Sequence, residues 1–260
     1  NDNLNQKGQI VAIRSFSLIF TNEKPRILFS EQFYQDIVQQ INLFIAESNP
    51  IVSMSSCKFF YTILPSNFEI LRPYALEVIK NLFQRLESTC DQNNQSISLR
   101  EMIIVTICQF YTKYDGMIPT QQFLEAVLPC LPLTNKIKYS SNIYFLLSTL
   151  QNEIIKDENM TKQLFRIYVL VISDRNKESN QMDPPMLYLM AYFIRQHSNL
   201  FQSEEEENEV IIQFFQEDEV AYHNFIQLYQ IYLSGYNQMV NPNIDLNDIA
   251  VIDLTGQQFD

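Results

Sequence analysis

Apolar residues recur at helical spacing along most of this chain. The clearest stripe lies in residues 71–86, where apolar positions follow one another at intervals of three and four residues. Glu77, Lys80 and Arg85 fall on the opposite side of this predicted helix. Pro73 lies in its first turn, where a missing backbone N–H costs no hydrogen bond. The pattern therefore predicts an amphipathic helix with one buried face.

Similar stripes, separated by capping residues and prolines, predict a chain made almost entirely of helices. Asn49 is expected to cap a helix that has Pro50 in its first turn. Ser98 and Glu101 have the spacing of a capping box. Besides residues 71–86, the predicted helices are 27–45, 50–64, 98–114, 119–131, 135–155, 161–173, 184–198, 205–216 and 218–232.

The predicted helices pair into hairpins that repeat. Comparable helix starts fall near Asn49, Ser98, Asn135 and Pro184, and their spacing scatters around the ~40–47 residues of HEAT and armadillo units. A tetratricopeptide array would need a stricter period of ~34 residues. We therefore predict an all-α fold, an α-α superhelix (HEAT-repeat solenoid) of about five to six helical hairpins over residues 1–240. Residues 241–260 form a tail without a clean helical period.

The composition excludes several classes of protein. The chain has 260 residues, of which 46% are hydrophobic and 18% charged, as in a folded protein. Only 4 residues are glycine, and none lies in a Gly-rich loop, which argues against a nucleotide-binding α/β fold. No apolar stretch is long enough to predict a transmembrane helix. Because the chain begins with Asn1 instead of Met, we interpret it as a fragment of a longer protein.

The net charge of −12 should repel nucleic acid and anionic membranes and favour basic protein partners. The densest negative charge is the run Glu204, Glu205, Glu206 and Glu207. One interpretation of this run is a contact for basic cargo. The other is a solvated loop and helix N-terminus, where carboxylates complement the helix dipole, and the sequence favours this second interpretation.

No constellation of catalytic or metal-binding residues stands out, so we predict no enzyme activity and no cofactor. His197 and His223 fall on different predicted helices without a Cys or His partner at ligand spacing. No carboxylate pair comes with the aromatic residues that a glycosidase needs, since the chain has no Trp. The cysteines form no CxxC pair, and buried free thiols in a reducing compartment are favoured over disulfides; they are Cys57, Cys90, Cys108 and Cys130.

Tyrosines cluster towards the C-terminal part of the chain. They could anchor a partner peptide, or they could pack in the core with their hydroxyls at the surface, which is the favoured interpretation. The tyrosines concerned are Tyr188, Tyr192, Tyr222, Tyr229, Tyr232 and Tyr236.

Residues 49–153 resemble the C-terminal HEAT repeats of an importin-β-type karyopherin, closest to the branch associated with ribosomal-protein and histone import. Three stretches carry the resemblance. They are Asn49-Pro50-Ile51-Val52 with Leu71-Arg72-Pro73-Tyr74-Ala75-Leu76-Glu77, then Leu99-Arg100-Glu101-Met102-Ile103-Ile104, and finally Ile118-Pro119 with Val127-Leu128-Pro129-Cys130-Leu131-Pro132-Leu133-Thr134. These motifs mark helix ends. The chain departs from the family where bulky residues such as Phe59, Phe60 and Tyr61 replace its small ones.

The resemblance implies a nuclear transport receptor that carries cargo between cytoplasm and nucleus under control of the GTPase Ran. In that family the second helix of each hairpin lines the concave face, which implies partner contacts by Glu69, Glu77, Glu87, Gln121 and Glu125. Another HEAT-repeat protein would share the same repeat pattern. The alternative function is therefore a structural scaffold subunit of a large assembly, with the aromatic first helices and the apolar tail as permanent interfaces.

Overall fold

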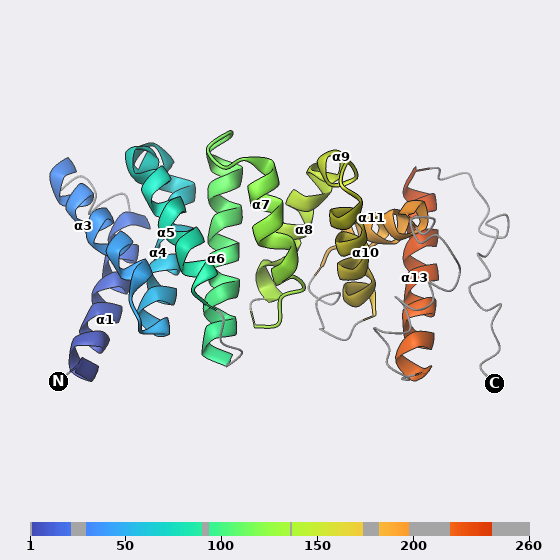
Figure 1. The fold of residues 1–260 in the computed structure, drawn as a ribbon, viewed down its shortest axis with the longest axis horizontal. Helices are drawn as coiled ribbons and strands as arrows, with labels where there is room; N and C mark the ends of the chain where they lie inside the picture. Colours follow the sequence, from blue (N-terminus) through green and yellow to red (C-terminus); the bar gives the residue numbers. More distant parts are fainter. Residues whose placement is uncertain are drawn as a thin grey trace. The chain divides into compact units, whose positions relative to one another are not determined.

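The computed structural model describes residues 2–21, 30–89, 94–135, 137–173, 182–197 and 219–240. Every regular element within these ranges is a helix (Figure 1), which confirms the all-α prediction. Two compact units divide the chain, unit 1 from Asn1 to Tyr139 and unit 2 from Ser140 to Asp260. The predicted helix 205–216 and the predicted tail 241–260 lie outside the described residues, so the predicted division at residue 240 stays a prediction.

Unit 1 is a stack of three helical hairpins. Their first helices are α1 (Asp2–Thr21), α4 (Pro50–Leu71) and α6 (Asn94–Lys113), and α4 packs against both α1 and α6. Their second helices are α3 (Glu31–Leu43), α5 (Ala75–Glu87) and α7 (Thr120–Val127). A short 3₁₀ turn adjoins each second helix. η1 (Phe44–Ala46) follows α3, η2 (Arg72–Tyr74) precedes α5, and η3 (Leu128–Cys130) follows α7.

The repeat is more regular in the structure than in the sequence-based prediction. The second helices of unit 1 begin at residues 31, 75 and 120, so they recur every 44 or 45 residues. Helices α4, α6, α8 (Ser140–Thr149) and α11 (Pro184–His197) begin at residues 50, 94, 140 and 184, an interval of 44 or 46 residues. Both intervals lie within the ~40–47 residues typical of HEAT and armadillo units.

Side-chain caps set two of the helix starts in unit 1. The Asn49 carboxamide oxygen accepts hydrogen bonds from the backbone N–H groups of Ile51 and Val52 at 2.9 and 3.2 Å, as predicted. Ser30 caps α3 through the N–H of Phe33 at 3.2 Å, so this helix begins at Glu31 and the predicted start at residue 27 is wrong. Each cap satisfies backbone donors that the first turn leaves without a helical partner.

Helix α4 continues past the predicted end at residue 64. Pro65 lies inside it, and the helix bends where Asn67 leaves the helical conformation with φ −130° and ψ 23°. The Asn67 side chain donates to the carbonyl oxygens of Ile63 and Phe20 at 2.9 and 3.1 Å, so it ties the bend to the end of α1. This buried amide supplies a donor to the Ile63 carbonyl at the point where Asn67 leaves the helical conformation.

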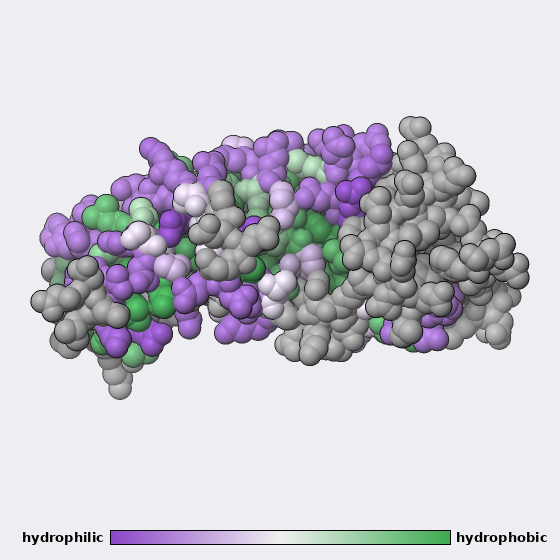
Figure 2. All heavy atoms as spheres, turned by 60° about the horizontal axis from the view of Figure 1, so that its bottom comes forward, coloured by the Kyte–Doolittle hydropathy of each residue, from purple (hydrophilic) through white to green (hydrophobic). Residues whose placement is uncertain are grey.

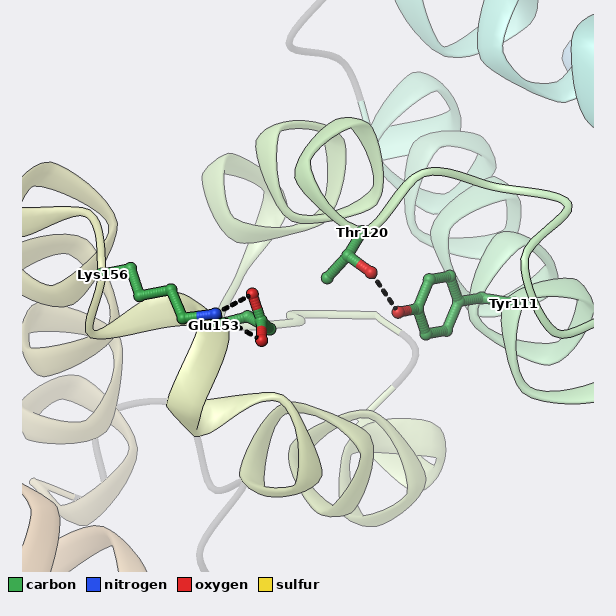
Figure 3. Close-up of polar contacts among 4 residues, drawn as sticks. All are labelled: Tyr111, Thr120, Glu153 and Lys156. Carbon is green, nitrogen blue, oxygen red and sulfur yellow. Dashed lines mark hydrogen bonds and ion pairs between the residues drawn. The ribbon is translucent and has the colours of Figure 1, made fainter.

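Helix α6 is the most enclosed element of unit 1. Every residue from 101 to 108 is buried, because α4 covers one side while α5, α7 and η3 cover the others. The helix begins at Asn94 and not at Ser98, so the predicted capping box is wrong. The Tyr111 hydroxyl and the Thr120 Oγ1 hydrogen-bond at 2.9 Å and join the end of α6 to the first turn of α7 (Figure 3). Gly116, at φ 74°, lies in the turn between the two helices.

The described residues of unit 2 form two further hairpins. In the first, α8 and the short α9 (Gln151–Ile154) precede α10 (Glu158–Ile172); in the second, α11 precedes α13 (Glu219–Val240). Leu150 interrupts the predicted helix 135–155. Asp157 caps α10 by accepting from the N–H of Met160 at 3.0 Å, so the predicted start at residue 161 is wrong. An exposed ion pair between Lys156 and Glu153, at 2.7 Å, spans the α9–α10 connection (Figure 3).

Helices α11 and α13 pack closely. The rings of Tyr192 and Tyr236 stack with centroids 4.1 Å apart, and a Cβ atom added at Gly235 would collide with the ring of Tyr188. Helix α13 reaches Val240, so the predicted end at residue 232 is wrong. The close approach requires glycine at position 235 and explains why a small residue stands in this tyrosine-rich helix.

Candidate partner-binding surface

Helices α3, α5 and α7 of unit 1 each expose one polar face. In α5, for example, Val78, Ile79 and Leu82 are buried and the opposite side of the helix is solvent-exposed. We call the exposed side chains of these three helices the second-helix face. It consists of Glu31, Gln32, Asp36, Gln39, Gln40, Leu43, Leu76, Glu77, Lys80, Gln84, Glu87, Gln121, Gln122 and Glu125.

The second-helix face is acidic. Its charged members are five carboxylates and a single lysine, namely Glu31, Asp36, Glu77, Glu87, Glu125 and Lys80. Glu77 lies in the first turn of α5 and Glu87 in the last, so they are separated by about 15 Å along the helix. Carboxylates distributed in this way produce a negative potential over the whole face, which attracts cationic groups before contact is made.

The carboxylates of α3 also act on Tyr74. Burial raises the pKa of its hydroxyl, and the charges of Glu31 and Asp36 on α3 raise the pKa further. Both carboxylates disfavour a second negative charge at the phenol oxygen. The α3 side of the face therefore carries the same sign of field as its α5 and α7 sides.

The structure places only part of the predicted binding set on this face. Glu77, Glu87, Gln121 and Glu125 belong to it, and the Gln121 amide donates to the Glu125 carboxylate at 3.0 Å. Glu69 does not, because it lies on the first helix α4, 3.8 Å from the Arg72 guanidinium with both side chains exposed. Its placement on a second helix was wrong because α4 extends beyond the predicted end. The run Glu204, Glu205, Glu206 and Glu207 lies outside the described residues.

Sequence reasoning missed Asp36 and Lys80. Both occupy the position five residues after the start of their helix, which Glu125 occupies in α7. The signal was the interval of 44 or 45 residues between second helices. This interval was not visible in the sequence, because the repeat had been measured between the predicted starts of first helices, and those starts were irregularly spaced.

A buried carboxylate was also missed. Glu101 on α6 is 3% exposed, and its oxygens accept hydrogen bonds from the Thr134 N–H and hydroxyl, each at 2.7 Å, and from the Asn135 N–H at 2.8 Å. These contacts hold the segment that leaves η3 against α6. Charge-assisted bonds of this kind are among the stronger ones in proteins. The role is structural, and Thr134 and Asn135 are the donors to this carboxylate.

The bulky aromatic residues of α4 belong to the core of unit 1. Phe59 and Phe60 are buried, and Phe59 packs edge-on against Phe20 of α1 with ring centroids 5.4 Å apart. Tyr61 is half-buried and contacts Tyr139 at 5.0 Å between centroids. These side chains are therefore not available as a permanent external interface. In unit 2, Tyr229 is buried, and the contacts between Tyr188 and Tyr232 and between Tyr192 and Tyr236 support core packing for this cluster.

An apolar groove lies between α1 and α3. It encloses about 200 Å³. On the face of unit 1 seen in Figure 2, hydrophobic surface alternates with hydrophilic side chains at this end of the unit. Asp36 is its charged lining residue, and the others are Ala12, Ile13, Phe16, Phe33, Ile37, Gln40, Ile41 and Phe44. An apolar groove with one carboxylate at its edge suits a contact with another chain more than it suits bond-making chemistry.

Burial shifts the pKa values of two cysteines and one histidine among the described residues. Burial raises the pKa of Cys57 to about 12 and also raises the pKa of Cys108, so both thiols stay protonated. Desolvation lowers the pKa of His197, whose ring lies 4.3 Å from that of Phe193. Within the described ranges no group of His, Cys, Asp and Glu side chains is arranged to hold a metal ion. Nor is any described helix long and apolar enough to span a membrane.

Comparison with known proteins gave no match to a family model, to a curated protein or to a solved structure.

Proposed function

We propose that the chain is a protein-binding helical repeat whose second-helix face receives a basic partner. The acidity of this face carries the proposal, since five carboxylates and one lysine are its charged groups. Such a face steers a lysine- or arginine-rich segment and then forms charge-assisted hydrogen bonds with it. The chain itself acts by binding and performs no catalysis.

The resemblance of residues 49–153 to importin-β-type karyopherins gives this proposal its finer form. In that form the chain is the C-terminal part of a nuclear transport receptor that moves between cytoplasm and nucleus and releases basic cargo under control of Ran. The hairpin interval of 44 to 46 residues supports a HEAT-type repeat. Small rotations between successive hairpins would change the curvature of the array and so change its grip on the cargo.

Capture of the endogenous protein tests the transport form of the proposal. An antibody against the chain would isolate the protein with its bound partners, and Ran loaded with a non-hydrolysable GTP analogue would be added. We expect lysine- and arginine-rich partners to be released by Ran-GTP, while Ran-GDP leaves them bound. Partners that stay bound in the presence of Ran-GTP would exclude the transport receptor and leave the more general binding proposal to its own test.

A scaffold subunit is the second candidate function. Exposed apolar side chains support it, since Val11, Leu18 and Leu43 are each more than half exposed, and large exposed apolar surface marks interaction sites. Phe59 and Phe60 are buried, so they cannot form the permanent interface that the scaffold was expected to have on its aromatic first helices. A scaffold subunit should aggregate when isolated and become soluble with a stoichiometric partner. A monodisperse monomer in size-exclusion chromatography with light scattering would count against the scaffold.

A further inference from the structure

The outer surface of the first two hairpins has a different charge from the second-helix face. Lys7, Val11, Arg14 and Leu18 follow one another along α1 at intervals of three and four residues, and all are exposed. They lie opposite the side of α1 where Phe16 and Phe20 contact the aromatic rings of α3. This stripe therefore points away from the second helices.

Helix α4 carries a matching stripe. Ile51 and Lys58 lie two turns apart on its exposed side, opposite Ser53, which bonds to the Ile45 carbonyl at 2.6 Å and so faces the second-helix layer. Because α1 and α4 pack side by side, the two stripes form one surface. We call it the first-helix face, made of Lys7, Val11, Arg14, Leu18, Ile51 and Lys58.

Lys7, Arg14 and Lys58 form no ion pair with any side chain in the part of unit 1 that the structure describes. Farther along α4, the exposed carboxylate of Glu69 is engaged by Arg72. In a chain with a net charge of −12, a positive surface of this kind is a local exception to the global charge.

Large apolar side chains stand between the cations. Val11 is 63% exposed, Leu18 71% and Ile51 39%. Val11 and Leu18 are separated by two helical turns, about 10 Å along α1. A partner helix with apolar residues at the same spacing would cover both of them and place its own charged residues beside Lys7, Arg14 and Lys58.

We propose that the first-helix face is a second docking surface, which binds an acidic amphipathic helix of a partner protein. Charge complementarity selects an acidic partner, and the exposed Val11, Leu18 and Ile51 require that it also present an apolar stripe. The second-helix face attracts partners of the opposite charge. Unit 1 can therefore hold an acidic and a basic partner at once, on two sides of the same stack of hairpins.

A designed peptide tests this proposal. The probe is a fluorescent amphipathic helix of Glu and Leu, with Leu at every third or fourth position, titrated into the full chain by fluorescence anisotropy. We expect saturable binding that weakens as salt is raised. Two control peptides replace Leu with Gln or Glu with Lys, and neither should bind this face.

Matched variants locate the site. The triple variant Lys7→Glu, Arg14→Glu, Lys58→Glu should weaken binding at least tenfold, and Val11→Ser with Leu18→Ser should weaken it severalfold. Lys80→Glu, on the second-helix face, should leave it unchanged, and circular dichroism should show that all variants stay folded. Absence of binding, equal binding of the Gln peptide or equal binding by the triple variant would overturn the proposal. Phosphatidylserine vesicles that bind as strongly as the peptide would also overturn it and would assign the face to membranes. Self-association of the chain that blocks binding of the peptide would overturn it as well.

Discussion

Glu101 and the glutamates of the second-helix face carry the same carboxylate group, but Glu101 lies in the interior of unit 1 and the others lie at its surface. Glu101 is buried in α6 and accepts hydrogen bonds from Thr134 and Asn135. Glu77 and Glu125 are exposed to solvent on α5 and α7. A buried carboxylate without partners would be strongly destabilising, whereas an exposed one contributes little to folding. Burial and hydrogen bonding, and not residue type, therefore separate the groups that hold unit 1 together from the groups that can recognise a partner.

The largest expected effect is a loss of stability when the buried carboxylate is removed. Glu101→Ala should lower the free energy of unfolding by about 2–4 kcal/mol, because it leaves the Thr134 and Asn135 N–H groups without their acceptor. Glu125→Ala is the matched control and should change the same quantity by less than about 0.5 kcal/mol. Urea denaturation followed by circular dichroism measures both. Equal effects of the two substitutions would remove the distinction between the regions.

A smaller effect is expected at the cap of α4. Asn49→Ala should cost about 1 kcal/mol, because two backbone N–H groups lose the carboxamide oxygen that they share. Asn49 also donates to the Gln6 side chain at 2.8 Å. Gln6→Ala removes only that second contact and should cost less than Asn49→Ala. A cost of Gln6→Ala as large as that of Asn49→Ala would show that the cap itself contributes little.

The buried cysteines test the enclosure of the core of unit 1 in the wild-type chain. Since burial raises the pKa values of Cys57 and Cys108 above that of an ordinary thiol, their thiolate fractions stay small at pH 8. We expect alkylation of these two residues, followed by mass spectrometry, to require unfolding by urea. Cys130, which is only partly buried, should react before them. Alkylation of Cys57 in the native chain at the rate of a free thiol would contradict the enclosed core.

His197 gives the smallest expected effect. Desolvation lowers its pKa in the folded chain, so the unfolded chain binds a proton more readily. Stability should therefore be complete above the ordinary histidine pKa of about 6.5 and should fall as the pH is lowered through the interval below it. His197→Gln should flatten this part of the stability curve, measured as the urea midpoint against pH. An unchanged curve in the variant would assign the pH dependence to other groups.

Local patterns predicted most of the described helices better than their boundaries, but α1 (Asp2–Thr21) was not among the predicted helices. The apolar stripe of α5 and the Asn49 cap depend on neighbours in sequence, and both were predicted. The end of α4 was not, because the side chain of Asn67 holds the bend after Pro65 through a hydrogen bond to the Phe20 carbonyl, 47 residues away. The capping-box prediction at Ser98 failed for a related reason, since Glu101 finds its donors at Thr134 and Asn135.

The candidate surface was predicted only in part for the same reason. Glu77, Glu87, Gln121 and Glu125 were named from their polar positions on predicted second helices, and the structure places them on one exposed layer. Glu69 was misplaced with the end of α4. Asp36 and Lys80 became recognisable only when the second helices were aligned at their true starts. Membership of a surface depends on helix boundaries, which long-range contacts decide.

The most direct test of the proposed function compares the two charged faces of unit 1 against one basic probe. A fluorescent peptide of alternating Lys and Ala would be titrated into the wild-type chain, into Glu77→Lys, Glu87→Lys, Glu125→Lys, and into the control Lys7→Glu, Arg14→Glu, Lys58→Glu. We expect the wild type to bind, the first variant to lose at least tenfold in affinity, and the control to bind no more weakly than the wild type. Equal affinity of the wild type and the second-helix variant, or no binding to either, would contradict the proposal that the second-helix face receives a basic partner.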